Sequence, residues 1–190
     1  MNRLATFTAF LDANVLYSAP IRDLLMNLTN TDLFRPKWSK AVLDEWISNL
    51  LENRPDLKPE QLERTRELMG KHAPDALVTG YEDLIEGLQL PDPKDRHVLA
   101  AAIRGRADVI ITENLKDFPP EILAPFGIEA QHPDEFILRL LDLAPGVVCS
   151  AAEHHRKTLK RPPKTLNAYL DKLEAQGLTQ TASVLREYMF

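Results

Sequence analysis

Cysteine is almost absent from this chain, and so are long hydrophobic runs and an excess of positive charge. The single cysteine, Cys149, cannot form an internal disulfide, which favours a reducing compartment such as the cytoplasm. No apolar stretch approaches the roughly 20 residues that a membrane-spanning helix needs, and from the composition of residues 1–4 we expect no signal peptide. The net charge of −5 argues against broad, non-specific binding of nucleic acid, which needs a basic surface.

The hydrophobic pattern predicts an α/β fold. Hydrophobic residues form 44% and charged residues 27% of the 190 residues, as in ordinary globular proteins. Short apolar runs predict strands at 7–11, 76–79, 108–112 and 127–130, and apolar periodicity with capping residues predicts helices at 20–30, 39–53, 59–70, 92–103 and 133–143, with a short one from Pro119. Because strands alternate with helices, we expect a parallel β-sheet flanked by helices.

The last part of the chain has a different pattern. After Pro145 and Gly146 no strand is evident, and two helices are expected at about 147–160 and 165–188. We therefore divide the chain into a first domain, residues 1–135, and a C-terminal helical extension, residues 136–190.

Acidic residues mark the ends of several predicted elements. Asp12 closes the first strand, and ligands bind at the carboxyl ends of strands in open α/β sheets. Asp117 lies in the polar loop after the strand at 108–112 and would reach the same edge. An Asp that ends a strand is more often a turn residue or a helix N-cap, so each position alone is weak evidence.

Two further acids lie on predicted helices. On the helix at 39–53, Asp44 and Glu45 occupy opposite edges of the apolar stripe, and the helical wheel cannot choose between them. Asp95 lies in the first turn of the helix that Asp92 caps, where a carboxylate is stabilised by about 0.3–1 kcal/mol. Both acids have ordinary structural explanations.

These acids would have a shared function if they meet at one end of the sheet. A group of carboxylates without a His or Cys partner selects Mg²⁺ or Mn²⁺. The chemistry that best matches such a site is metal-assisted hydrolysis of a phosphodiester, in which the ion activates a water and neutralises charge at phosphorus. Convergence would also raise the pKa of at least one carboxyl in the absence of metal.

Four segments, in order, carry a resemblance to a known family: 10–16 (FLDANVL), 43–46 (LDEW), 92–102 (DPKDRHVLAAA) and 111–119 (ITENLKDFP). With them the chain resembles the PIN-domain family of metal-dependent ribonucleases, and more narrowly the VapC-type toxins of bacterial toxin–antitoxin systems. The resemblance spans about residues 5–135. It implies a PIN-like α/β/α sandwich, a Mg²⁺ or Mn²⁺ cofactor, an RNA substrate, a homodimer and an inhibitory antitoxin protein.

The resemblance also implies roles for particular residues. Asp12, Glu45 and Asp95 would be the metal-binding and catalytic acids, which favours Glu45 over Asp44. Many PIN domains have a further acid two residues after the threonine, but Asn114 occupies that place here, so Asp117 is the candidate for the fourth acid. The residues that would orient the site or bind substrate are Asn14, Thr112 and Asn114. The number of metal ions stays open.

A basic segment and two other functions remain to be weighed. Residues 154–164 contain five Lys or Arg and no acid, which fits either a solvated helix end or a contact with the RNA backbone. A haloacid-dehalogenase-type phosphatase also begins with an Asp at the end of a strand, but it needs a second Asp where this chain has Asn14. A non-catalytic PIN-fold regulator is the other alternative.

Overall fold

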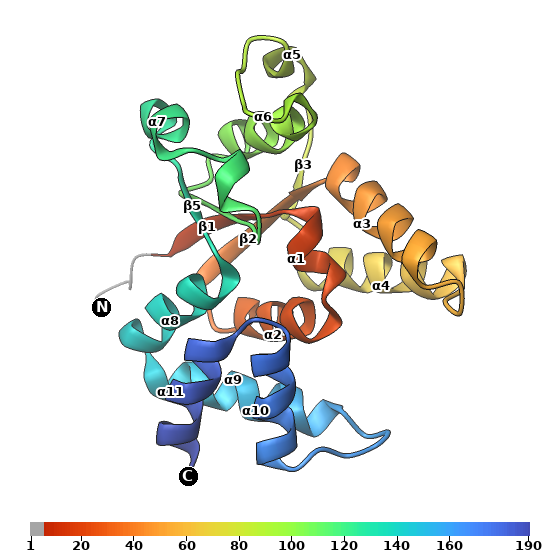
Figure 1. Cartoon of the computed structure of the whole chain (residues 1–190), viewed down its shortest axis with the longest axis vertical. Coiled ribbons are helices and arrows are strands. Elements are labelled where there is room, and N and C mark those ends of the chain that lie inside the picture. The colour runs from red at the N-terminus through yellow and green to blue at the C-terminus, as the bar shows by residue number, and fades with distance from the viewer. Residues whose placement is uncertain (1–5) are drawn as a thin grey trace.

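A five-stranded parallel sheet forms the centre of the molecule in a computed structural model, which describes residues 6–190 (Figure 1). The spatial order is β3-β2-β1-β4-β5, made of β1 (Phe7–Leu11), β2 (Phe34–Ser39), β3 (Leu77–Val78), β4 (Val109–Ile111) and β5 (Glu129–Gln131). All four strand pairs are parallel. The predicted α/β class is confirmed.

Helices cover both faces of this sheet. Figure 1 shows α6 on one side of the sheet and α2 and α4 on the other. The helices are α1 (Ala13–Tyr17), α2 (Ala19–Thr29), α3 (Lys40–Asn53), α4 (Pro59–His72), α5 (Glu82–Ile85), α6 (Arg96–Arg104), α7 (Pro120–Leu123), α8 (Pro133–Leu143), α9 (Pro145–Thr158), α10 (Leu166–Ala175) and α11 (Thr179–Met189), with 3-10 turns η1 (Pro93–Asp95), η2 (Leu115–Asp117) and η3 (Ala124–Phe126). None of them is long and apolar enough to cross a membrane.

The two central strands bring the first two polar segments together. β1 and β4 lack polar alternation because helices bury both faces of the sheet there, and Phe10 and Ile110 are fully buried. Leu11 pairs with Ile111, and the Asp12 N–H donates to the Ile111 carbonyl at 3.1 Å. Asp12 and Thr112 therefore emerge side by side at the carboxyl edge of the sheet.

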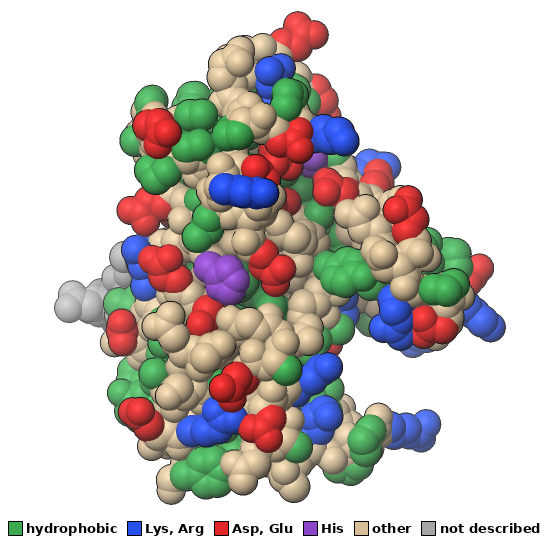
Figure 2. All heavy atoms as spheres, viewed as in Figure 1, with side chains coloured by type: hydrophobic (Ala, Val, Ile, Leu, Met, Phe, Trp, Pro, Cys, Tyr) green, Lys and Arg blue, Asp and Glu red, His purple; other side chains and the backbone are tan. Residues whose placement is uncertain are grey.

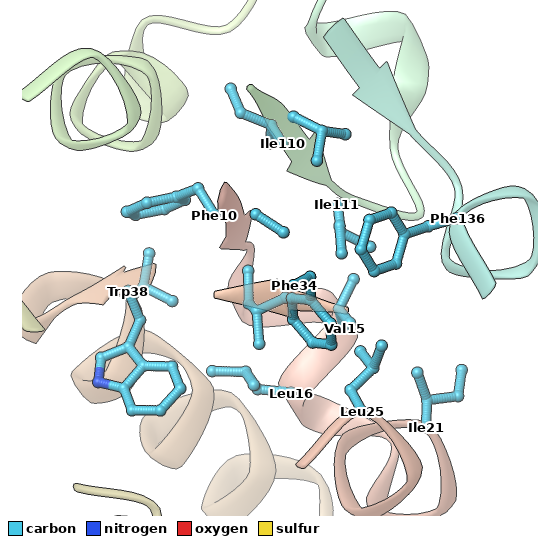
Figure 3. Close-up of a cluster of buried hydrophobic side chains, with 14 of the residues drawn as sticks. Phe10, Val15, Leu16, Ile21, Leu25, Phe34, Trp38, Ile110, Ile111 and Phe136 are labelled. Carbon is cyan, nitrogen blue, oxygen red and sulfur yellow. The ribbon is translucent and has the colours of Figure 1, made fainter. Parts of the chain in front are cut away.

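A large apolar core packs against the strands that lead to this edge (Figure 3). Phe34 of β2 packs edge-on against Phe136 of α8, with ring centroids 5.1 Å apart. Leu16 of α1 and Leu25 of α2 join the same buried cluster. The short helix that follows Asp12 is thus anchored by burial rather than by its own length.

The sequence patterns missed β2, the strand next to β1. Its sequence, FRPKWS, contains two cations and Pro36, which usually argues against a central strand. The Trp38 N–H donates towards β3, to the Ala76 carbonyl, and alternate residues of a strand direct their N–H groups to the same side. β3 pairs only with Trp38 and Ser39 and does not extend as far as Pro36. The N–H that Pro36 lacks would therefore have had no partner strand on that side.

After α8, the C-terminal extension continues with α9, α10 and α11, and the single helix expected at 165–188 was wrong. It is divided into α10 and α11 because Gly177 adopts φ +95, which ends the first helix. The N–H of Leu178 then donates to the carbonyl of Leu173 at 3.1 Å, which satisfies a helix end in the manner of a Schellman motif. Residues 1–4, on which the expected lack of a leader rests, lie outside the described range.

Candidate active site

Asp12 is held rigidly at the end of β1. Its Oδ1 accepts a hydrogen bond from the Ala13 N–H at 2.7 Å, so it caps α1. Its Oδ2 accepts from the Thr112 hydroxyl at 2.8 Å and from the Asn14 side-chain amide at 3.1 Å. Burial raises the pKa of Asp12, and the bonds from Thr112 and Ala13 partly oppose that rise. The N-cap explanation for Asp12 is correct, yet its second oxygen belongs to a wider network.

That network joins the ends of β1 and β4. The Asn14 amide nitrogen also reaches the Thr112 hydroxyl oxygen at 3.1 Å, and the Asn14 carbonyl oxygen accepts from the Glu113 N–H at 3.1 Å. The Thr112 hydroxyl in turn accepts from the Asn114 N–H at 3.1 Å. Asn14 and Thr112 are therefore placed to fix the orientation of the Asp12 carboxylate, as the resemblance implies.

Asp95 lies close to the other acids at the N-terminal end of α6. It ends the turn η1. Asp92 caps this turn, because its carboxylate accepts from the Lys94 N–H at 2.9 Å. Burial raises the pKa of Asp95 to about 6, with further contributions from the charges of Asp12, Asp117, Asp92 and Glu45. The contributions from these four carboxylates have the direction that a shared site predicts.

The structure separates the two candidate acids on α3. Asp44 accepts from Lys40 at 2.6 Å and from Arg66 at 2.7 Å; although burial alone would raise the pKa of Asp44, these partners hold it below its usual value. Glu45 instead lies 3.5 Å from the ring of His97 on α6, and its charge acts on Asp12 and Asp95. Glu45 therefore belongs to the acidic cluster, and Asp44 belongs to a separate surface ion-pair network.

Asn114 and Asp117 are partners in the turn η2. The Asn114 side-chain amide donates to the Asp117 carboxylate, and the Asp117 N–H donates back to the Asn114 carbonyl at 3.1 Å. Asn114 thus holds Asp117 in place, and which of the two fills the fourth position stays a prediction. The charge of Asp117 contributes to the raised pKa of Asp95, which places it in the cluster.

The oxygen donors of these acids suit a divalent metal, but their side chains do not already surround an ion site. Within residues 6–190, no three His, Cys, Asp or Glu side chains already form a group that could hold an ion. Mg²⁺ usually keeps several waters and is bound by only one or two carboxylates. The buried, pre-oriented Asp12 and the partly buried Asp95 supply oxygen donors of this kind. The pKa of Asp95 is raised first by burial and then by the negative charges of its carboxylate neighbours.

Two nearby residues received no role from the sequence patterns. His97 lies within the third motif, and its contact with Glu45 joins α3 to α6. Glu113 follows Thr112, and its pKa is raised, first by partial desolvation and then by the charge of Asp12, while His132 lowers it. The only sequence signal that could have identified them is that His97 lies two residues after Asp95 and Glu113 directly after Thr112.

The basic segment 154–164 is less available than its composition indicates. Arg156 forms hydrogen bonds to both carboxylate oxygens of Glu153 at 2.7 Å, and Lys157 lies 3.4 Å from the same carboxylate. The His155 ring is buried and bonded to the Tyr169 hydroxyl at 2.9 Å. A contact between this segment and RNA stays a prediction that rests on its remaining cations.

Comparison with known proteins identifies the family. The sequence profile of the PIN domain matches residues 8–116, which is more than half of the chain. The chain belongs to the PIN-domain family. A second profile, that of the VapC50 C-terminal domain, matches residues 133–187. The PIN segment and the C-terminal helices of this chain thus each match a known family.

One similar curated protein is VapC50 of Mycobacterium tuberculosis (strain ATCC 25618 / H37Rv), which is provisionally assigned as a ribonuclease. This PIN-domain chain is 44% identical to it over 108 residues, which cover 55% of the chain and 63% of the relative. The match therefore spans less than two thirds of that relative. No solved structure matches the chain.

Proposed function

We propose that this PIN-domain chain is a Mg²⁺- or Mn²⁺-dependent endoribonuclease that acts in the cytoplasm as the toxin of a toxin–antitoxin pair. The observation that carries the proposal is the environment of Asp95, whose pKa of about 6 reflects burial among four other carboxylates. A divalent cation bound by these carboxylates would neutralise their mutual repulsion. The provisional ribonuclease assignment of VapC50 supports RNA as the substrate.

The residues of the cluster would divide the work. A bound divalent ion supplies an activated water and neutralises charge at the phosphorus centre. Asp12 and Asp95 would hold the ion, with Asn14 and Thr112 keeping the Asp12 carboxylate oriented. Glu45, steadied by His97, and Asp117, held by Asn114, would complete the acidic wall and accept protons from bound water.

The proposed partners are an antitoxin protein and a second copy of the chain. Both rest on the resemblance to VapC-type toxins. The acidic cluster favours an antitoxin that places a cationic side chain near Asp95, where it would relieve the repulsion between the carboxylates. Light scattering on the purified chain tests the homodimer directly.

A phosphatase of the haloacid-dehalogenase type is not favoured by the geometry. That reaction needs an acid/base carboxyl two residues after the nucleophilic Asp. Asn14 occupies the position, and both ends of its amide are used to bridge Asp12, Thr112 and Glu113. Hydrolysis of p-nitrophenyl phosphate by the purified protein would reopen this alternative.

The experiment that tests the ribonuclease proposal compares two neighbouring acids on α3. Glu45→Gln and Asp44→Asn each remove one negative charge from the same helix. With total RNA and Mn²⁺, we expect the wild type and Asp44→Asn to produce the same discrete fragments and Glu45→Gln to produce few or none. EDTA should abolish cleavage by all three. No cleavage by the wild type under any metal condition would support the non-catalytic regulator instead.

A further inference from the structure

His132 occupies a position that none of the proposed catalytic roles explains. It follows β5 directly and caps the N-terminus of α8. The last residue of β5, Gln131, pairs with Ile111, and its carbonyl accepts from the Thr112 N–H at 3.0 Å. His132 and Glu113 therefore emerge next to each other, one residue beyond this contact, at the edge that carries Asp12.

The orientation of the His132 ring is fixed by its neighbours. Its Nδ1 accepts a hydrogen bond from the Asp134 N–H at 3.2 Å. A ring nitrogen that accepts this bond carries no proton, so the proton of the neutral ring lies on Nε2. Within residues 6–190 no acceptor is bonded to Nε2. The ring therefore presents one N–H donor whose direction is set by the helix cap.

The C-terminal helices α10 and α11 pack beside His132 and Asp134. A Cβ atom at Gly177, in the turn between α10 and α11, would lie 3.8 Å from the Cε1 atom of His132. The Asp134 carboxylate, which is buried, accepts from the N–H groups of Gln180 and Thr181 at 3.0 and 2.8 Å. Figure 1 shows the α10–α11 turn beside the start of α8.

The same turn also contacts the element that follows Asp12. The Ser18 hydroxyl, at the end of α1, donates to the side-chain oxygen of Gln176 at 2.8 Å. The helical extension is thus docked against both α1 and the β5–α8 junction, which flank the carboxyl edge of the sheet. This placement puts the turn between α10 and α11 beside His132 and bonds α11 to Asp134, whose N–H holds the His132 ring.

We propose that His132 binds a phosphate of the RNA next to the one that is cleaved, with its Nε2–H as the donor and the C-terminal helices as the support that aims it. The proposal rests on the ribonuclease function proposed above. An acidic cluster repels the RNA backbone, so a substrate needs donors at the rim of the site. The positioned N–H of His132 supplies one such donor.

Two substitutions separate the donor from the helix cap. In His132→Asn the side-chain oxygen can still accept from the Asp134 N–H, since Asn is among the best N-cap residues, but no group reaches the position of Nε2. In His132→Gln the longer amide can place an N–H near the position of Nε2 while the cap is weakened. The melting temperature should therefore fall more in His132→Gln than in His132→Asn.

The assay uses the whole chain and a short single-stranded RNA that spans a cleavage site mapped in total RNA. We expect His132→Asn to raise KM roughly tenfold or more, as loss of a hydrogen bond to a charged group does, with a smaller change in kcat. We expect His132→Gln to keep KM near that of the wild type. If KM instead rises more in His132→Gln, the less stable variant, than in His132→Asn, the variant without the donor, the proposal is wrong.

A matched set of RNAs then locates the contact. In each RNA one phosphate is replaced by a neutral methylphosphonate. The wild type should bind one of these RNAs, modified beside the cleavage site, more weakly than the unmodified RNA, and His132→Asn should lose that discrimination. An equal penalty in both proteins would show that His132 does not contact that phosphate.

Failure of the ribonuclease proposal can be recognised separately. RNA binding is measured by fluorescence anisotropy with and without His132→Asn in an Asp95→Asn background, where cleavage is not required. If the wild type cleaves no RNA but His132→Asn still weakens binding, the ribonuclease function fails and the His132 contact stands. If the chain binds no RNA, both proposals are wrong.

Discussion

Thr112→Val removes one hydroxyl from the centre of the site while keeping the shape of the side chain. The fully buried hydroxyl donates to Asp12 and accepts from the Asn14 amide and the Asn114 N–H. A bond to a charged group is worth about 1.5–3 kcal/mol and a neutral one about 0.5–1.5 kcal/mol. Because Asn14 keeps a direct bond to Asp12, we expect a loss of roughly 2–4 kcal/mol in the free energy of unfolding.

The same change should weaken metal binding. Burial raises the pKa of Asp12, and the Thr112 bond is the first influence that lowers it again. Without that bond the pKa of Asp12 rises further, and protons compete better with the ion. Urea unfolding in EDTA measures the stability, and the rise in melting temperature on adding Mn²⁺ measures the metal affinity.

Thr112→Ser is the matched control, because it keeps the hydroxyl and loses only a methyl group, at a cost of about 0.8 kcal/mol. We expect Ser to retain most of the Mn²⁺-dependent rise in melting temperature and Val to lose most of it. If Val and Ser behave alike in both measurements, the Thr112 hydroxyl does not organise Asp12 and the reasoning fails.

Three further changes test other parts of the account. In EDTA, the contribution of Asp95 to the free energy of unfolding should fall as pH rises from 3.8 towards about 6, because the folded state holds a proton on Asp95 that the unfolded state has released. Asp95→Asn should remove this contribution, and a curve that the substitution leaves unchanged would show that the pKa of Asp95 is not raised in the folded state. Asp134→Ala should cost about 2–4 kcal/mol in urea unfolding, because α11 loses two bonds to a buried carboxylate, and an equal loss in the exposed Glu135→Ala would contradict this. Gly105→Ala should cost about 1–3 kcal/mol, because its Cβ would lie 2.8 Å from a methyl carbon of Val78, and wild-type stability in thermal melts would refute the predicted overlap.

The parts of the fold that could be predicted are those with a strong local signal. Ser39 caps α3 with its hydroxyl, 3.2 Å from the Val42 nitrogen, as the sequence indicated. The strand β2 could not be predicted, since Pro36 is tolerated only because β3 is too short to reach it. That relation involves two distant segments and leaves no mark in a local pattern.

The candidate site shows the same division between local and distant information. The position of Asp12 at the end of a buried strand was readable from the sequence. The choice between Asp44 and Glu45 was not readable from the helix alone, because it depends on Arg66 of α4 and His97 of α6. The break between α10 and α11 rests on Gly177, whose positive φ became visible only in the folded chain.

The most direct test of the central claim is the chemistry of the cleaved ends of the RNA. Water attack at phosphorus in the proposed acidic site leaves a 5′-phosphate and a 3′-hydroxyl, and it does not use the 2′-hydroxyl of the substrate. The account predicts that purified protein with Mn²⁺ produces these ends, still cuts an RNA with a 2′-deoxy sugar at the cleaved linkage, and does neither after Asp95→Asn or with EDTA. Products that end in a 2′,3′-cyclic phosphate, formed equally by Asp95→Asn, would contradict it.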